Sequence, residues 1–338
     1  MSKEKVWGLM VYLSKNQWMS EYRDTIEFDE SFWSYILEKC SETGINTILL
    51  EVGDGVYYES HPEIALKDSW KPEKVKAEVE RCRALGIELV PKLNFSSAHS
   101  FWMKEYRNMT SSKPYYDFCS DVIKEIYELF LHPKYIHLGY DEEVPICCHK
   151  PEIEYQIMRR GKLLMDDFIF LVREVQKTGA TPWAWHDPLW DHTEDYLKYV
   201  DLKENVILSP WYYMGLKKEH FTPIEPKAPD GTPNEWYEEG YRFFEEHPIF
   251  SNATEYFFSG KVLEMMEKGV KYIPVPSIYS SDYNTDDMVE FFKNGEPSEE
   301  SIVGFLTAPW LPTLWDSKEK IDKSLELLAA ARKKYYGE

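Results

Sequence analysis

The stretch GINTILLEV, residues 44–52, contains the unit that decides the fold: a glycine followed by a short apolar run. The same order returns at Gly86 before IELVPKLNF, at Gly179 before ATPWAW and at Gly269 before VKYIPVPSIY. Each glycine follows an amphipathic helical pattern, and glycine readily takes the left-handed conformation that ends a helix. We therefore interpret these glycines as turns from a helix into a strand.

Eight apolar runs are candidate strands, and the helical patterns between them show apolar residues at helical spacing. The predicted strands are Val6–Leu13, Thr47–Val52, Glu88–Phe95, Tyr135–Tyr140, Thr181–His186, Val206–Trp211, Tyr272–Tyr279 and Val303–Pro309. The apolar stripes include Val75, Val79, Cys82 and Leu85 after Pro72, and later Leu164, Phe168, Leu171 and Val175. Runs that are almost continuously apolar are typical of parallel strands covered on both faces.

Helical patterns separate most of the strands, and a last helix is predicted from about Lys318 to Tyr336. Eight strand-helix units within the length of one domain favour an α/β fold of the (β/α)8 TIM-barrel type. A doubly wound open sheet is the alternative, but no glycine-rich phosphate loop follows the first strand. We therefore predict a single catalytic barrel over residues 1–338, without a separate accessory domain.

The chain is strongly acidic. Its 338 residues carry 39 Lys and Arg against 59 Asp and Glu, which gives a formal net charge of −20. Such a charge repels phosphate backbones and anionic lipids, so nucleic acid and membrane surfaces are disfavoured as partners. The sequence has no apolar run long enough to span a bilayer and no secretory signal near its start. We expect a cytoplasmic protein, and the sequence leaves its oligomeric state open.

Reactive side chains follow the predicted strands. Because the C-terminal ends of barrel strands meet at one mouth, the residues after each strand form one set. That set contains Lys15, Glu51, Asp54, Asn94, His99, Asp141, Glu142, Trp185, His186, Asp187, Trp211, Tyr212, Tyr279, Asp282, Tyr283 and Trp310. Acids, histidines and tryptophans are therefore expected to converge on one end of the barrel.

Carboxylates surrounded by aromatic rings are typical of carbohydrate chemistry. The apolar C–H face of a sugar stacks on Trp or Tyr, and a carboxylic acid protonates the leaving oxygen when a glycosidic bond breaks. Most of the 12 Trp and 24 Tyr are expected to serve packing. Trp185, Trp211 and Trp310 differ because each falls at a strand end, so we expect them to face a carbohydrate or glycoconjugate substrate.

The stretch HLGYDE, His137–Glu142, resembles the H-x-G-G-D-E motif of the glycoside hydrolase family 20 β-N-acetylhexosaminidases. Other strand ends resemble the same family in the same order. They are NTILLEVGDGVYYESHP with Asp54, VPKLNFSSAHS with His99, WHD at residues 185–187, and GFLTAPW ending at Trp310. Matches at successive strand ends are much more specific than any single one of them.

The resemblance implies a retaining exo-β-N-acetylhexosaminidase that acts on a terminal 2-acetamido sugar and needs no metal or cofactor. Glu142 would be the general acid, and Asp141 would orient the substrate's own acetamido group, whose oxygen attacks the anomeric carbon. An adjacent negative charge and a tryptophan-walled pocket would both favour the protonated form of Glu142. By the same pattern, Asp54 and His99 would form a relay that tunes Glu142, with His137 as a supporting residue.

The resemblance also implies how the sugar is held. Trp185, Trp211 and Trp310 would wall the sugar and its acetamido group, while Asp187 and Lys15 would bind hydroxyls. A tyrosine is expected to donate its phenol to the acetamido oxygen, and the sequence leaves this role open between Tyr279 and Tyr283.

Departures from the family pattern keep other functions open. Lys15 stands where the family has arginine, Tyr140 replaces the second glycine of the motif, and Lys92 and Asn94 replace acidic positions. The sugar, gluco or galacto, and its linkage therefore stay open. One alternative is a sugar-binding barrel with lost or altered turnover. The other is an isomerase or hydrolase that binds a divalent metal through Glu51, Asp141, His186 and Asp187.

Overall fold

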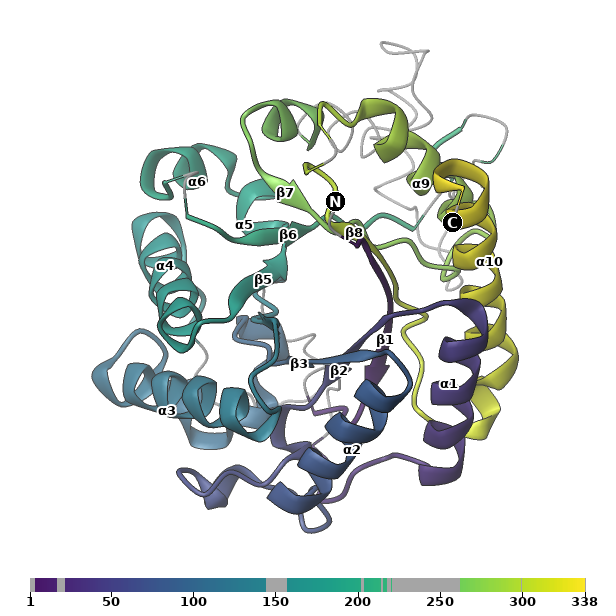
Figure 1. Ribbon diagram of the computed structural model, residues 1–338. Coiled ribbons are helices and arrows are strands. Elements are labelled where there is room, and N and C mark those ends of the chain that lie inside the picture. Colours follow the sequence, from purple (N-terminus) through teal and green to yellow (C-terminus); the bar gives the residue numbers. More distant parts are fainter. Residues whose placement is uncertain are drawn as a thin grey trace, which may run out of the picture.

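The computed structural model describes residues 4–16, 22–143, 157–201, 204–213, 215–217, 220, 262–298 and 300–337. Eight parallel strands form one sheet in the order β7-β6-β5-β4-β3-β2-β1-β8. Figure 1 is a view along the barrel axis and shows a ring of strands inside a ring of helices. The predicted (β/α)8 barrel is confirmed.

The elements alternate along the chain as predicted. The strands are β1 Val6–Tyr12, β2 Thr47–Glu51, β3 Glu88–Lys92, β4 Tyr135–His137, β5 Thr181–Trp185, β6 Ile207–Ser209, β7 Lys271–Tyr272 and β8 Gly304–Thr307. The helices include α1 Glu30–Thr43, α2 Pro72–Ala84, α3 Lys113–Leu129, α4 Gly161–Thr178, α5 Asp187–Trp190, α6 Thr193–Tyr199, α9 Asn284–Gly295 and α10 Lys318–Tyr336. None of the helices in these ranges is both long enough and apolar enough to cross a bilayer.

The seam between β7 and β8 closes the barrel. The N–H of Val303 donates to the carbonyl of Tyr272 at 2.8 Å, and Leu306 donates to Pro274 at 3.0 Å. One step further, Ala308 donates to Pro276 at 3.2 Å. Proline has no N–H to donate, so beyond Tyr272 the β8 side supplies the donors of this seam.

Strand positions agree with the prediction, but the hydrogen-bonded ladders end earlier. The fourth strand stops at His137 because Gly139 and Tyr140 take left-handed backbone conformations, with φ of 66° and 65°. The seventh predicted strand is reduced to Lys271–Tyr272 because prolines interrupt its ladder. The segments beyond the ladders stay apolar because they line the mouth of the barrel.

The predicted helix-to-strand turns are confirmed. Gly44, Gly86, Gly179 and Gly269 all have positive φ, at 73°, 75°, 101° and 94°. The apolar stripe of α2 is shorter than predicted, because Leu85 caps the C-terminus of the helix and is 38% exposed. The stripe of α4 is buried as expected.

Two apolar clusters hold the barrel together. The larger one joins residues of the strands to residues of the surrounding helices. The inner cluster fills the barrel and includes Trp183 and Trp185, both almost fully buried. Trp211 and Trp310 pack against this inner cluster at the C-terminal ends of the strands. The aromatic wall of the mouth is therefore an extension of the barrel core.

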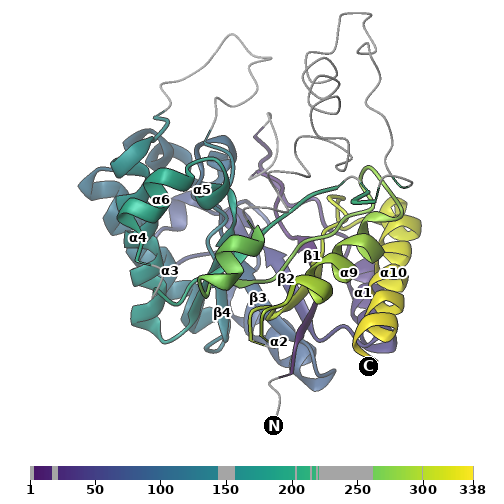
Figure 2. The same ribbon diagram turned by 90° about the horizontal axis from the view of Figure 1, so that it is seen from above.

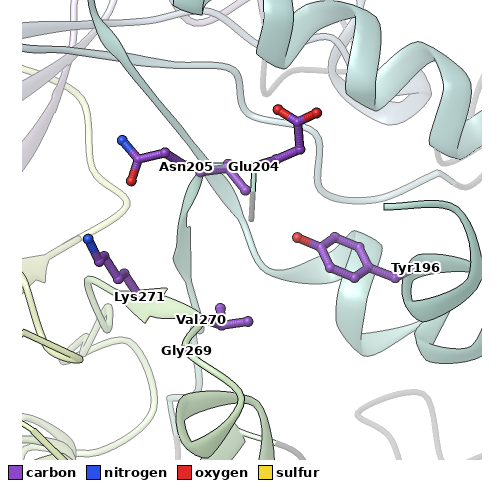
Figure 3. A pocket seen from close by; sticks show the side chains of 7 residues that line it. Tyr196, Glu204, Asn205, Gly269, Val270 and Lys271 are labelled. Atoms are coloured by element: carbon purple, nitrogen blue, oxygen red, sulfur yellow. The ribbon is translucent and has the colours of Figure 1, made fainter. Parts of the chain in front are cut away.

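A cavity of about 170 Å³ lies at the opposite end of the barrel, seen in Figure 3. Its walls come from the segments that precede β6 and β7 and from α6. The lining residues are Tyr196, Glu204, Asn205, Val206, Gly269, Val270 and Lys271. This is the N-terminal end of the strands, which in such barrels serves stability rather than chemistry. Figure 2 shows the barrel from the side, with the N-terminal end of β1 toward the bottom.

Candidate active site

The three consecutive carboxylates after β4 occupy three different environments. Asp141 is largely buried, with 16% of its side chain exposed, whereas half of the Glu142 side chain faces solvent. Glu143 is buried again, with 5% of its side chain exposed, and binds Arg159. The left-handed pair Gly139 and Tyr140 turns the chain just before these acids, and a Cβ on Gly139 would lie 2.4 Å from Asn94.

His99 lies between the first two acids. Its Nε2 is 3.2 Å from an oxygen of Asp141 and 3.2 Å from an oxygen of Glu142. Asn94 and Ser96 donate to the other oxygen of Asp141, at 3.1 and 2.8 Å. These contacts bring the predicted catalytic acids and His99 together at one point of the mouth.

The electrostatics of this group favour a charged pair. Burial alone would raise the pKa of Asp141, but the His99 cation, Lys92 and the hydrogen bond from Ser96 hold it well below its usual range. Burial would lower the pKa of His99, yet the Asp141 and Glu142 carboxylates raise it to about 10. Asp141 is therefore an anion, which can accept a hydrogen bond from an amide N–H.

Asp54 is buried, and the segment after β1 supplies two of its hydrogen bonds. Ser14 Oγ donates to one of its oxygens at 2.5 Å and Asn16 Nδ2 donates to the other at 2.7 Å. Burial raises the pKa of Asp54 to about 6, although these two hydrogen bonds oppose the shift. Within the described part of the chain, Asp54 thus binds the segment after β1, whereas His99 binds Asp141 and Glu142.

His137 accepts a hydrogen bond from the backbone of the turn after β4. It is fully buried, and its Nδ1 accepts the N–H of Gly139 at 2.9 Å. Its ring packs against Trp183 and Trp185, with centroids 5.0 and 4.7 Å away. Burial lowers its pKa well below the usual value. A neutral His137 therefore supports the turn that presents the acids.

Aromatic rings form a continuous wall beside the acids. Trp185 and Trp310 lie with centroids 5.7 Å apart, and Tyr213 lies 5.9 Å from Trp310 and 5.3 Å from Trp211, on which it stacks. Trp310 holds a left-handed conformation with φ of 56°. The three predicted tryptophans therefore do come together.

Tyr213 was not predicted, although it completes this wall. Burial raises the pKa of its phenol, and the carboxylates of Asp187, Asp141 and Glu142 raise it further, which places the phenol close to the acids. The predicted alternatives are much more open to solvent, since Tyr279 is 68% exposed and Tyr283 is 56% exposed. Tyr213 directly follows Trp211 and Tyr212, and this aromatic run at a strand end was the available signal.

The two predicted hydroxyl-binding residues have different surroundings. Asp187 is buried and accepts a hydrogen bond from Trp211 Nε1 at 2.9 Å, and burial together with Asp141 raises its pKa well above the usual value. Lys15 lies after β1, where its ammonium group is 2.7 Å from the Glu27 carboxylate. Asp187 is therefore bound to the aromatic wall through Trp211, whereas Lys15 forms an ion pair with Glu27.

One residue of the metal-binding alternative, Glu51, already has a cationic partner. Glu51 accepts a hydrogen bond from Lys92 at 2.8 Å in the barrel interior, where both side chains are at most 3% exposed. A different group of acids has oxygens within 4.8 Å of one another, namely Asp286, Asp287 and Glu290 on α9. Lys217 and His220 form ion pairs with this group.

Tyr140, the bulky residue in the motif, does not obstruct the site. Its side chain is 1% exposed and points into the layer between barrel and helices, where its hydroxyl donates to the carbonyl of Leu164 at 2.7 Å. Its ring lies 5.2 Å from that of Phe168. The backbone at this position is left-handed, with φ of 65°, a conformation that glycine adopts without strain.

Known proteins resemble this chain in sequence and in fold. Residues 65–223, just under half of the chain, match the model of the glycosyl hydrolase family 20 catalytic domain. The resemblance to glycoside hydrolase family 20 is confirmed. The prediction of a glycosidase is supported by the same family match, and the segment matched contains His99, Asp141, Glu142 and Tyr213. No protein with a curated description matches the sequence.

Solved structures of family 20 share the fold at low sequence identity. The N-acetyl-β-hexosaminidase of Streptomyces plicatus, solved with Thio-NAglucal, is 14% identical with a TM-score of 0.57, covering 98% of this chain and 68% of that one. The family 20 β-N-acetylhexosaminidase of Streptomyces coelicolor is 13% identical with a TM-score of 0.58, covering 98% and 68%. The β-N-acetylhexosaminidase of Bacteroides fragilis is 13% identical with a TM-score of 0.59, covering 96% and 65%.

Proposed function

We propose that this family 20 domain is a retaining exo-β-N-acetylhexosaminidase that uses the acetamido group of its substrate as the nucleophile. The main support is the buried Asp141 anion directly beside Glu142, with His99 touching both acids. An anion at this position can hold the acetamido N–H and so direct the amide oxygen toward the anomeric carbon. Glu142 reaches into solvent at the mouth, where it can protonate the leaving oxygen.

The aromatic wall supports a sugar as the ligand. Trp310 and Trp211 offer apolar ring faces next to the acids, with the buried Trp185 packed against Trp310, and Tyr213 offers a phenol close to Asp141 and Asp187. We assign the phenol of Tyr213, rather than Tyr279 or Tyr283, to the acetamido oxygen. Asp187 would bind the hydrogen-bonding groups of the same sugar.

The catalytic step can be followed atom by atom. The acetamido oxygen forms a bond to the anomeric carbon while the glycosidic bond breaks, and the Glu142 proton moves to the leaving oxygen. Water then attacks the anomeric carbon from the face that the leaving group vacated, the bond between that carbon and the acetamido oxygen breaks, and Glu142 takes up a proton from the water. Two displacements at one carbon return the original configuration, which is why retention is expected.

The decisive experiment compares aryl β-glycosides with and without a 2-acetamido group. We expect chromophore release only from the 2-acetamido substrates, a loss of about 100-fold or more in Glu142→Gln, and unchanged activity in the exposed control Glu128→Gln. Excess chelator should leave the rate unchanged. Equal cleavage of substrates without the acetamido group would contradict the mechanism, and loss of activity with chelator would favour the metal-binding alternative.

One observation favours a second candidate, a sugar-binding barrel with altered turnover. Lys15 stands where the family uses an arginine to hold outer hydroxyls, and here Glu27 already engages its ammonium group at 2.7 Å. Tight binding of acetamido sugars without any release of the aryl group would support this candidate.

A further inference from the structure

Glu143 and Arg159 form a buried ion pair directly beside the proposed general acid. Arg159 Nε donates to one oxygen of Glu143 at 2.7 Å, and Nη2 donates to the other at 3.1 Å. The backbone N–H of Arg159 adds a third bond to Glu143 at 2.9 Å. The two side chains are 1% and 5% exposed, and burying charges this fully is costly unless the geometry satisfies them.

The remaining donors of Arg159 are also satisfied. Nη2 donates to the carbonyl of Phe95 at 2.6 Å, and Nη1 donates to Asp167 at 3.2 Å. The guanidinium group lies over the ring of Tyr140, 4.7 Å from its centroid. Asp167 in turn accepts bonds from the hydroxyls of Ser111 and Tyr116. The network therefore reaches from the mouth of the barrel to α3 and α4.

Glu143 links the two loops that carry the reactive groups. It accepts the backbone N–H of Ser97 at 2.9 Å, two residues before His99. The next N–H, that of Ala98, donates to the carbonyl of Glu142 at 3.2 Å. Phe95, which binds Arg159, belongs to the same loop after β3. The ion pair thus fixes the loop of His99 against the loop of Glu142.

We propose that Glu143 and Arg159 are positioning residues that hold the Glu142 carboxyl within reach of the leaving oxygen. This inference rests on the proposed function, because it assigns the ion pair to the proton-donating step. Both side chains are too deeply buried to contact a sugar in the mouth of the barrel. Their effect is transmitted through the backbone of Glu142 and through the placement of His99.

Leaving groups of different basicity provide the test. A 2,4-dinitrophenyl group departs without a proton, whereas a phenyl group needs one, so a misplaced acid slows only the second substrate. We expect Arg159→Lys and Glu143→Gln to lower kcat/KM about tenfold or more for phenyl 2-acetamido-2-deoxy-β-glucoside, and less than about threefold for the 2,4-dinitrophenyl analogue. The informative quantity is the ratio of kcat/KM for the 2,4-dinitrophenyl substrate to kcat/KM for the phenyl substrate. Glu142→Gln lacks the acid altogether, so it gives the largest ratio that loss of the acid can produce.

The ratio of the two rates does not depend on how much of a variant folds, because unfolded protein lowers both rates equally. Tyr116→Phe is the matched control, since it removes a hydroxyl from the far side of the same network. We expect it to lower the unfolding midpoint and leave the ratio unchanged.

Two negative results can be told apart. A wild-type protein that cleaves both substrates, together with variants that keep the wild-type ratio, would overturn the positioning role alone. A wild-type protein that cleaves neither 2-acetamido substrate would overturn the proposed function and this inference with it.

Discussion

At the scale of single residues, chemically similar acids acquire different properties within a few ångströms. The His99 cation keeps the pKa of Asp141 low, whereas burial and the Asp141 charge raise the pKa of Asp187. Glu143 forms an ion pair with Arg159. Titratable groups whose pKa values are pushed apart are a recurring sign of divided acid and base roles. The group around Asp141 fits that pattern.

The choice among the three tyrosines is a residue-scale prediction. We expect Tyr213→Phe to lower kcat about 100-fold, as the loss of one hydrogen-bond donor to a developing charge typically does. Tyr279→Phe and Tyr283→Phe should each change kcat less than about twofold, because both side chains are mostly exposed. Steady-state kinetics on one aryl 2-acetamido glycoside compares all three, and a large loss in Tyr279→Phe would reverse the assignment.

The His99–Asp141 pair predicts how stability changes with pH. The pKa of His99 rises from 6.5 to about 10 on folding, so its contribution is complete below about pH 6.5 and lost as the pH rises toward 10. The pKa of Asp141 is lowered from 3.8, so its contribution is present above about pH 4 and lost in acid.

Urea unfolding of the wild type and of His99→Gln measures this contribution. The difference in unfolding free energy between them should be largest near pH 5 to 6 and should shrink steadily toward pH 10. A difference that stays constant across this range would show that His99 does not change its ionisation on folding.

At the scale of elements, the sequence located the strands well and the ends of their ladders poorly. Apolar runs locate strands, but they do not reveal where Gly139 and Tyr140 turn left-handed or where Pro274 interrupts pairing. The predicted set of mouth residues follows the sixth strand only as far as Tyr212, so Tyr213 falls outside it. The Asp54–His99 relay stays a prediction that rests on the resemblance, because side-chain contacts of this kind depend on loop conformations that periodicity does not specify.

The buried pair between β2 and β3 gives an element-scale prediction. Lys92→Met would leave the Glu51 charge in the barrel interior without its cationic partner, and we expect a loss of about 3–5 kcal/mol in unfolding free energy. The double variant Lys92→Met with Glu51→Leu should recover most of this loss, because it removes both charges. Equilibrium urea denaturation measures both, and a double variant as unstable as the single one would contradict this account.

At the scale of the whole molecule, the barrel separates chemistry from stability. The acids and the aromatic wall lie at the C-terminal ends of the strands, and the cavity of Figure 3 lies at the N-terminal ends. The packed core of the barrel separates these two ends. Substitutions at the N-terminal ends of the strands are therefore expected to alter the stability of the protein and to leave kcat unchanged.

Gly269→Ala tests this separation. Gly269 has φ of 94°, and an added Cβ would meet no atom within 4 Å, so the cost is backbone strain alone. We expect about 1–2 kcal/mol lower unfolding free energy and an unchanged kcat for the folded protein. Thermal unfolding measures the loss of stability, and kinetics normalised to the concentration of active sites measures kcat. A substantial drop in kcat would indicate coupling between the two ends of the barrel.

The proline-rich side of the β7–β8 seam has a practical consequence. Beyond Tyr272, whose N–H donates to Ser301, the carbonyls of Pro274 and Pro276 accept while Leu306 and Ala308 donate, so this part of the joint has its exchangeable protons on the β8 side alone. Hydrogen–deuterium exchange at those two amides would therefore record transient opening of the ring, and would time it without an attached probe.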